Sequence, residues 1–428
     1  MARAMARVAP EVEGIVVAAR ESGASRRAGS GRERFAGIAV LRGEHPVPGR
    51  GSFAAASRIA GAVSRRSPNT CVLVLLSGGA SSLLAMPAPG VSIPDKIRLG
   101  RVLLGAGLAI AETNAVRKHV SAIKGGGLLR LGAPSEVITL AISDVVGDDL
   151  ATIGSAPAVP DPTTYADALA ALEASAAAPA VPPAILAHLR RGRDAARRPG
   201  RSGTGRGPRE TVKPTDPEAR RAKGVVIGSN RTAVTGAVRE AKALGYAVRR
   251  LVRPLTGEAS RAAARFARAL SRTPPEPACV IAGGETVVTA VGARGTGGRC
   301  QEFALALAPH VAGTDWQVLA AGTDGIDGRT RAGGAFCDGW TLARAGAAAI
   351  SRDLAAHDSN GFFRRHGGLF SPGPSGTNAL DVVIALHPGA GPSPTRARSR
   401  RTPEGRSNPS RGRSSQRGRG TSPPGRAT

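Results

Sequence analysis

A short cationic segment is the first feature of the sequence that could do chemistry. Arg117, Lys118, His119 and Lys124 lie close together between Asn114 and Gly126. Arginine can hold a carboxylate or phosphate through two parallel hydrogen bonds, and lysine supplies a point charge. The segment therefore predicts a clamp for a small anion, although a solvated helix face would give the same pattern. His119 is expected to be structural or anion-binding rather than a metal ligand.

A turn rich in serine and glycine, Ser77-Gly-Gly-Ala-Ser-Ser82, follows an apolar run. Glycines let the backbone approach an oxyanion closely, and a following helix N-terminus would add positive potential. The turn is neither a Walker loop nor a dinucleotide fingerprint, because the sequence has no GxxxxGK[ST] motif and no GxGxxG after a strand. The residues predicted to cradle an anion are Ser77, Gly78, Gly79, Ser81 and Ser82.

Carboxylates gather at two further turns, and the candidate ligands for Mg²⁺ are Asp144, Asp148, Asp324 and Asp327. A magnesium ion facing phosphates needs one or two protein carboxylates and keeps most of its waters. Asp144 and Asp324 could instead orient an attacking hydroxyl. Anion donors and carboxylates in one crevice suit phosphoryl transfer, and they would also suit a metal-assisted hydrolase.

Five apolar runs each end in a turn of this kind, which indicates how the candidate residues are positioned. The runs are 71–76, 137–142, 225–227, 279–282 and 318–321. Helical patterns are predicted over 94–112, 230–244 and 341–350. This alternation is typical of an α/β protein with open, mostly parallel sheets flanked by helices. In such sheets, ligands bind beyond the carboxyl ends of the strands.

Composition excludes several other classes of protein. The four cysteines of the 428 residues are scattered without a CxxC pair, which excludes a disulfide scaffold and a thiolate zinc cluster. No GxSxG elbow is present, and no apolar run approaches the 18 residues of a membrane span. We expect a soluble, cytoplasmic protein with no membrane partner.

The net charge of +28 is unevenly distributed. Segments 190–213 and 390–428 are rich in Arg, Gly, Ser and Pro and poor in large apolar residues, so both are predicted to be disordered. A nucleic-acid tether is the functional alternative, but a compositional tail is favoured, and only 3% of residues are aromatic, which disfavours base stacking.

Nine of these motifs, in order from about His45 to about Leu386, resemble the type-2 glycerate kinase family with its C-terminal MOFRL region. They are Leu75–Leu84, Asn114–Gly126, Ser143–Asp149, Val159–Thr164, Ile227–Asn230, Gly283–Thr286, Gly297–Leu305, Ala321–Gly328 and Gly373–Asn378.

The resemblance implies a two-domain α/β kinase that transfers the γ-phosphoryl of ATP to D-glycerate, with Mg²⁺, in a cleft between its domains. The expected boundaries are a Rossmann-like domain at 1–189, a basic disordered linker at 190–222, a C-terminal part at 223–387 and a disordered tail at 388–428. The expected catalytic residues are Arg117, Lys124, Asp144 and Asp324. Further nucleotide-binding residues are Gly228, Ser229, Asn230, Gly283, Gly284 and Glu285. Substrate-binding residues are Arg117, Lys118, Arg299, Gln301, Glu302, Thr377 and Asn378.

The sequence departs from the family pattern in two places. The family begins with a strand and a Gly-Ala-Gly-Lys-Ala turn, whereas Met1–Arg7 resembles the helix after that turn. The expected alternatives are a start placed too far downstream or an inactive or weakened member lacking that lysine. Cys300 replaces the family's asparagine. Some relatives are labelled hydroxypyruvate reductases, which the missing dinucleotide fingerprint argues against. A homodimer is compatible with the sequence, which does not determine the oligomeric state.

Overall fold

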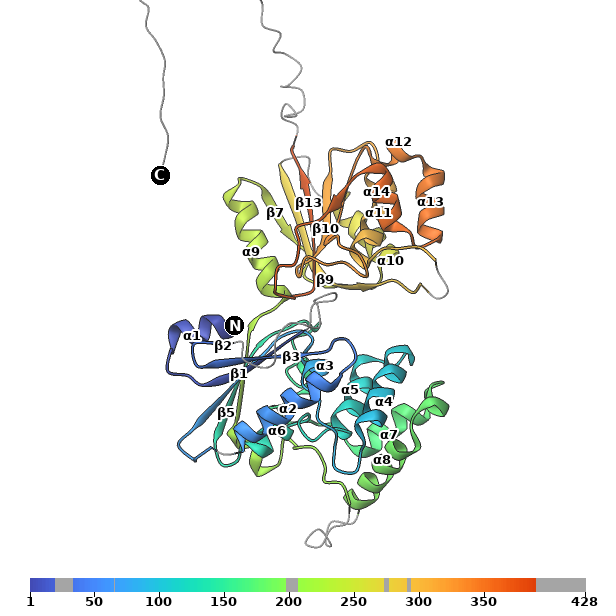
Figure 1. Ribbon diagram of the computed structural model, residues 1–428. Coiled ribbons are helices and arrows are strands. Elements are labelled where there is room, and N and C mark those ends of the chain that lie inside the picture. Colours follow the sequence, from blue (N-terminus) through green and yellow to red (C-terminus); the bar gives the residue numbers. More distant parts are fainter. Residues whose placement is uncertain (20–33, 65, 198–206, 273–276, 291–293, 390–428) are drawn as a thin grey trace, which may run out of the picture. The chain divides into compact units, whose positions relative to one another are not determined.

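A computed structural model describes residues 1–19, 34–64, 66–197, 207–272, 277–290 and 294–389 (Figure 1). The tail predicted to be disordered lies outside the described residues, apart from residues 388 and 389. The five apolar runs are all strands, as predicted. No helix in the described ranges is long and apolar enough to cross a membrane.

The described N-terminal strands form two three-stranded sheets. The first has the order β1-β3-β2, with β1 parallel to β3 and β2 antiparallel to it. The second has the order β4-β5-β6 and is wholly parallel, as predicted. The bounds are β1 Gly14–Ala19, β2 Arg34–Phe35, β3 Ile38–Gly43, β4 Cys71–Leu76, β5 Glu136–Ile142 and β6 Ala222–Gly228.

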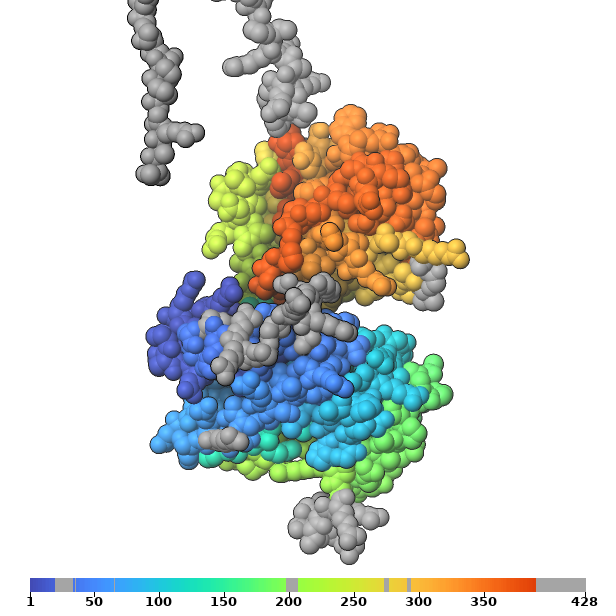
Figure 2. Space-filling view, in the orientation of Figure 1, coloured from blue at the N-terminus to red at the C-terminus, as the bar shows by residue number. Residues whose placement is uncertain are grey.

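Helices accompany these strands, and α5, α7 and α8 pack around a shared apolar core. Figure 2 shows the cyan surface of α4 and α5 beside the green surface of α7 and α8. The helix predicted over 94–112 is broken in two, because Gly107 has a left-handed φ of 64°. The α-helices are α1 Ala2–Val8, α2 Arg50–Val63, α3 Ala80–Leu83, α4 Ile93–Gly105, α5 Ile110–His119, α6 Gly127–Leu131, α7 Tyr165–Glu173 and α8 Pro183–Ala196. Short 3-10 turns cover Ile153–Ser155, Ala178–Ala180 and Pro217–Arg221.

The prediction of a disordered linker over 190–222 is wrong for much of its length. Helix α8 continues to Ala196, while residues 198–206 lie outside the described ranges. Beyond them, Val212 is fully buried, and its backbone pairs with Gly125 and Asp161. The physical reason is that one apolar and one acidic side chain, Val212 and Glu210, anchor an otherwise basic segment.

The boundary expected at 223 also lies too early in the chain. Strand β6 pairs with β5 in the N-terminal sheet. Helix α9, Asn230–Ala243, packs instead on three C-terminal strands, which are β7 (Ala247–Arg250), β9 (Ala278–Val287) and β13 (Asp381–His387). The chain therefore passes from one sheet to the other at Gly228 and Ser229.

The C-terminal sheet has the order β12-β11-β10-β13-β9-β7, with β8 also paired to β9. It is mixed rather than mostly parallel, because β13 runs antiparallel to both β10 and β9. Only β7 and β8 are parallel to β9 among the described pairs. The bounds are β7 Ala247–Arg250, β8 Leu255–Glu258, β9 Ala278–Val287, β10 Gln317–Gly322, β11 Gly334–Asp338, β12 Leu369–Phe370 and β13 Asp381–His387.

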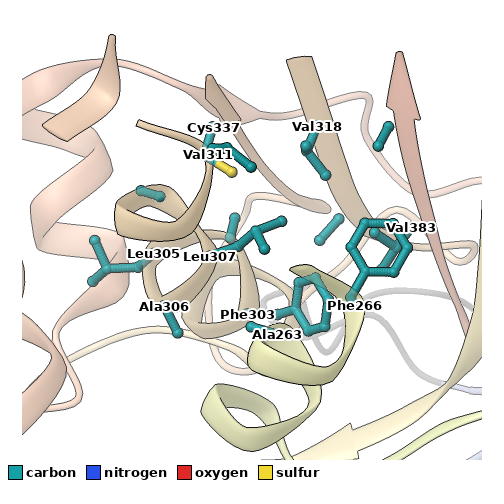
Figure 3. Close-up of a cluster of buried hydrophobic side chains, with 14 of the residues drawn as sticks. Ala263, Phe266, Phe303, Leu305, Ala306, Leu307, Val311, Val318, Cys337 and Val383 are labelled. Atoms are coloured by element: carbon teal, nitrogen blue, oxygen red, sulfur yellow. The ribbon is translucent and has the colours of Figure 1, made fainter. Parts of the chain in front are cut away.

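Strand β9 is buried on both faces, which explains its continuous apolar sequence. Val280 and Ala282 face a large core that also holds Phe266 and Phe303 (Figure 3). Cys279 and Ile281 pack in a second cluster with α9. The remaining helices are α10 Ala259–Leu270, α11 Arg299–Val311, α12 Thr341–Ala345, α13 Ala347–Ala355 and α14 Ser359–His366.

Candidate active site

Loops at the carboxyl ends of the N-terminal parallel strands bring together a histidine, a glycine turn and an aspartate. His45 follows β3, Gly78 and Gly79 follow β4, and Asp144 follows β5. A Cβ on Gly78 would lie 2.8 Å from Asp144 Oδ2, and one on Gly79 would lie 3.3 Å from His45 Cδ2. Gly79 also has a φ of 81°, which favours glycine. Glycine therefore lets His45 and Asp144 flank the turn closely.

The loop that carries His45 is fixed at both sides. Glu44 accepts hydrogen bonds from the first backbone N–H groups of α2, at Gly51 (3.2 Å) and Ser52 (3.0 Å). Ser82 donates its hydroxyl to the carbonyl of Pro46. These bonds fix the loop on both sides of His45, and none of them involves its imidazole ring.

The electrostatics of this pair favour proton transfer. Burial lowers the pKa of His45, and the charge of Asp144 opposes that shift only in part. Burial raises the pKa of Asp144, and the charge of His45 opposes it. His45 is therefore neutral near pH 7 and able to accept a proton.

The neighbouring basic side chains of α5 have different partners. Lys118 Nζ lies 3.0 Å from Asp161 Oδ1, and both side chains are buried. Burial by itself would raise the pKa of Asp161, but Lys118 holds it below its usual value. His119 Nε2 lies 3.1 Å from Glu210 Oε2. Lys118, which was predicted to bind substrate, is thus paired with a carboxylate inside the protein. His119 also contacts a carboxylate of the protein, which fits the structural one of its two predicted roles.

Arg117 and Lys124 are not paired with a carboxylate in any ion pair among the described residues. Lys124 is 3% exposed, and its Nζ donates to the carbonyl of Gly154 at 3.2 Å. Burial lowers the pKa of both side chains. Two cations that the fold leaves without counter-charge are the arrangement expected of an anion site.

A chain of hydrogen bonds joins this cationic site to the glycine turn. Ser81 Oγ lies 2.8 Å from Ser155 Oγ, which donates to Asn114 Oδ1 at 2.9 Å. Gly154, Ser155 and Ala156 are three successive left-handed residues, with φ of 59°, 62° and 50°. Such strain in two non-glycine residues is found mainly where the fold fixes a functional loop. The hydroxyls of Ser81 and Ser82 are thus bonded within the protein, and any anion contact of the turn falls to Ser77 and the backbone.

In the C-terminal domain, Asp327 closes the N-terminus of α11. It is 2% exposed and accepts hydrogen bonds from the backbone N–H of Cys300 (3.1 Å) and Gln301 (2.8 Å), and from Gln301 Nε2 (2.9 Å). Its carboxylate oxygens are therefore used by the helix. Glu302, the next predicted substrate ligand, pairs with His357 at 2.9 Å.

Replacing Asp327 by alanine is expected to lower the free energy of unfolding by about 1–3 kcal/mol, because buried N–H groups lose their acceptor. Urea denaturation measures this, with exposed Asp315→Ala as the control. If Asp327 were a metal ligand, the Mg²⁺ concentration for half-maximal activity would rise in the same variant. We expect no such change.

Arg299 is held between two carboxylates. Its Nε and Nη2 lie 2.6 and 3.0 Å from the Asp381 oxygens, and Nη1 lies 2.8 Å from Glu285 Oε1. Burial raises the pKa of Asp381 to about 6 even though Arg299 opposes that shift. Burial raises the pKa of the Cys300 thiol well above the usual value, so a neutral thiol stands where the family has an asparagine.

Several other predicted residues make contacts that stabilise the C-terminal domain. Asn230 Nδ2 donates to the carbonyls of Ala379 (2.9 Å) and Asp381 (2.8 Å). A Cβ on Gly283 would lie 1.9 Å from Asn230 Oδ1, and one on Gly284 would lie 2.2 Å from the carbonyl of Leu255. These glycines permit close packing in the C-terminal domain.

The remaining predicted residues lie at loop or element ends. Gly228 ends β6, and Ser229 precedes α9 as its N-cap. Asp324 accepts a hydrogen bond from the N–H of Ile326 at 3.0 Å, and Asn378 accepts one from Leu380 at 2.9 Å. Further loop positions are Asp148, which has a φ of 59°, and exposed Thr377.

The predicted magnesium ligands do not assemble a metal site of their own. Within the described ranges, no group of three or more His, Cys, Asp or Glu side chains could hold a metal ion. Asp327 is a helix cap, Asp144 and Asp148 lie in the loop after β5, and Asp324 lies in the loop after β10.

Sequence reasoning missed His45, Asn114 and Ser155 as parts of this site. The segment around His45 follows a strand, as the other candidate turns do, and that position was the available signal. Asn114 and Ser155 meet across 41 residues, and no local pattern indicates their contact.

Comparisons with known proteins agree with the two-domain α/β architecture. Residues 1–190 match the "Domain of unknown function (DUF4147)" family, and residues 278–381 match the MOFRL family. The chain is 34% identical to the glycerate 2-kinase of Pyrococcus horikoshii, over 90% of this chain and 84% of that protein. It is 36% identical to a putative hydroxypyruvate reductase of Agrobacterium vitis, over 82% and 77% of the two chains.

A solved structure extends the similarity to the fold. The crystal structure of glycerate kinase from Thermotoga maritima matches with a TM-score of 0.72 and 32% identity, covering 87% of this chain and 85% of that one. The fold class is therefore confirmed as two-domain α/β. The chain belongs to the glycerate kinase family whose C-terminal part is the MOFRL region.

Proposed function

We propose that the protein is a D-glycerate 2-kinase, which transfers the γ-phosphoryl group of ATP to the 2-hydroxyl of D-glycerate. The observation that carries this proposal is the hydrogen-bonded link between the cationic site and the glycine turn. Lys124 donates to the carbonyl of Gly154, and Ser155 bonds Ser81 of the turn that His45 and Asp144 flank. Family membership supports the substrate class, because the relatives from Pyrococcus horikoshii and Thermotoga maritima are glycerate 2-kinases.

In this mechanism Arg117 and Lys124 bind the carboxylate of glycerate and orient its hydroxyl. His45 accepts the hydroxyl proton as that oxygen bonds to the γ-phosphorus, and Asp144 stabilises the resulting imidazolium. The bond from the γ-phosphorus to the bridging oxygen breaks, and ADP leaves. Arg299, oriented by Asp381 and Glu285, is proposed to offset charge on the transferring group.

Magnesium is proposed to arrive with the nucleotide, whose phosphates supply ligands that the described protein residues do not gather. We also propose a cytoplasmic location and a homodimer.

The test is incubation of the protein with ATP, Mg²⁺ and D-glycerate, followed by chromatographic separation of 2- and 3-phosphoglycerate. We expect 2-phosphoglycerate and stoichiometric ADP, with L-glycerate as the control acceptor. Absence of any glycerate-dependent ADP would contradict the proposal. It would favour the alternative of an inactive or weakened family member.

A reductase is the second candidate, favoured only by the name of the Agrobacterium vitis relative. It requires a nicotinamide cofactor, and the sequence has no GxGxxG turn after a strand. Incubation with hydroxypyruvate and NADH or NADPH is expected to give no cofactor oxidation.

A further inference from the structure

Lys96 is a third buried cation beside the proposed anion site. It lies on α4, is 6% exposed, and donates from Nζ to the carbonyl of Val120 at 2.7 Å. Three charged or titratable groups on other segments interact electrostatically with Lys96. They are Arg117 on α5, Lys124 in the following loop and His188 on α8.

All of these neighbours are cationic or neutral. The charges of Lys96 and Arg117 both lower the pKa of Lys124, and burial together with Arg117 lowers the pKa of Lys96 to about 7. His188 stays neutral near pH 7 because burial lowers its pKa, and its Nε2 pairs with the carbonyl of His119.

The same region supplies a carboxylate to the buried lysine that is structural. Lys118 Nζ lies 3.0 Å from Asp161 Oδ1. Within the described ranges, no ion pair involves Lys96, Arg117 or Lys124. Buried like charges without a partner are costly, so negative charge must come from outside the protein for all three to be cationic together.

We propose that Lys96, Arg117 and Lys124 form one site for a small oxyanion, in which Lys96 takes up a proton as the anion binds. The anion is a carboxylate or a phosphoryl group on a small acid. This deepens the proposed function, on which it rests only for the identity of that acid. Lys96 thereby matches the charge of the site to the charge of its ligand.

The sign of the pH dependence follows from linkage. A bound anion stabilises the charged ammonium and raises the pKa of Lys96 above about 7. Below pH 7 the lysine is already charged, and binding takes up no proton. Above pH 7 binding takes up close to one proton, and the dissociation constant rises by about tenfold per pH unit until the pKa of the complex is reached.

Isothermal titration calorimetry at pH 6 and pH 8, in buffers of different ionisation enthalpy, measures this proton uptake. Sulfate is the first probe, because it stays a dianion throughout that range and is independent of the proposed substrate. D-Glycerate and 2-phosphoglycerate are the second and third probes. For the wild type we expect more proton uptake at pH 8 than at pH 6, with Lys96 contributing up to one proton of the difference.

Three variants separate Lys96 from other titrating groups. Lys96→Met should lower the uptake at pH 8 by up to one proton, because only Lys124, whose pKa burial also lowers, is left to take one up. It should fold normally because a repelling charge is removed. Lys96→Arg should keep the charge and lose the same part of the uptake. Lys242→Met, at an exposed position on α9, should behave as the wild type.

The outcomes separate the role of Lys96 from the proposed kinase substrate. Unchanged proton uptake in Lys96→Met overturns the proposal, and so does failure of all three anions to bind the wild type. If sulfate binds with uptake that requires Lys96 but D-glycerate does not bind, the anion site is supported and the proposed kinase substrate is wrong. If D-glycerate binds without proton uptake, the kinase proposal survives and the role of Lys96 does not.

Discussion

Replacing Lys124 by methionine is expected to lower kcat/KM for D-glycerate by about 10²–10³-fold, the effect of removing one preorganised charge from an active site. The same change should leave the free energy of unfolding unchanged or higher. Lys124 is buried, and its cationic neighbours Lys96 and Arg117 already oppose its charge. Steady-state kinetics and urea denaturation of the same preparation measure the two effects.

Lys118→Met is the matched control, six positions away and also buried. It should lower the free energy of unfolding by about 3–5 kcal/mol, because Asp161 would remain as a buried charge without its partner. One oxygen of Asp161 already lacks a hydrogen bond. Equal destabilisation by both substitutions would show that Lys124 is structural and would remove the basis for the anion site.

Replacing His45 by glutamine is expected to lower kcat by about 10²–10⁴-fold with little change in KM, because the variant cannot accept the hydroxyl proton. Burial lowers the pKa of His45 below the usual 6.5, so the wild-type imidazole loses its acceptor capacity only at more acidic pH. The wild-type profile of kcat should therefore fall on the acid side, and the corresponding part of that fall should be absent from His45→Gln.

The control is His310→Gln, at the exposed end of α11. It should retain the wild-type rate and pH profile. A His45→Gln variant that keeps its kcat, or that changes only KM, would assign His45 to substrate binding and would leave the base unidentified.

The strands that carry the candidate site were predictable because each is a continuous apolar run ending in a polar turn. The predicted run 71–76 has the same bounds as strand β4, and strands β5, β9 and β10 include the runs predicted for them. Parallel pairing of β4 and β5 then brings Ser77 and Asp144 to one sheet edge, as expected of strands whose carboxyl ends coincide.

The partners of individual charged residues were not predictable in the same way. Lys118 and Lys124 are the same residue type in the same segment. In the described part of the chain only Lys118 meets a carboxylate, contributed by Asp161 43 positions later. Asp327 resembles a metal ligand until α11 is placed against it by tertiary packing. These distinctions depend on contacts between distant segments, which no local spacing encodes.

The direction of the C-terminal strands was missed for a related reason. An apolar strand flanked by helices looks alike whether its neighbour is parallel or antiparallel. Strand β13 was not predicted as an insertion between β9 and β10, and that insertion makes this sheet mixed.

The position of β13 also sets an order of events during synthesis on the ribosome. All strands of the N-terminal sheets precede residue 229, so that domain can fold while the rest of the chain is still being translated. The C-terminal sheet must wait for Asp381–His387, because β9 and β10 have no partner at their facing edges before then. A nascent chain stalled earlier would display two apolar edges to chaperones and proteases.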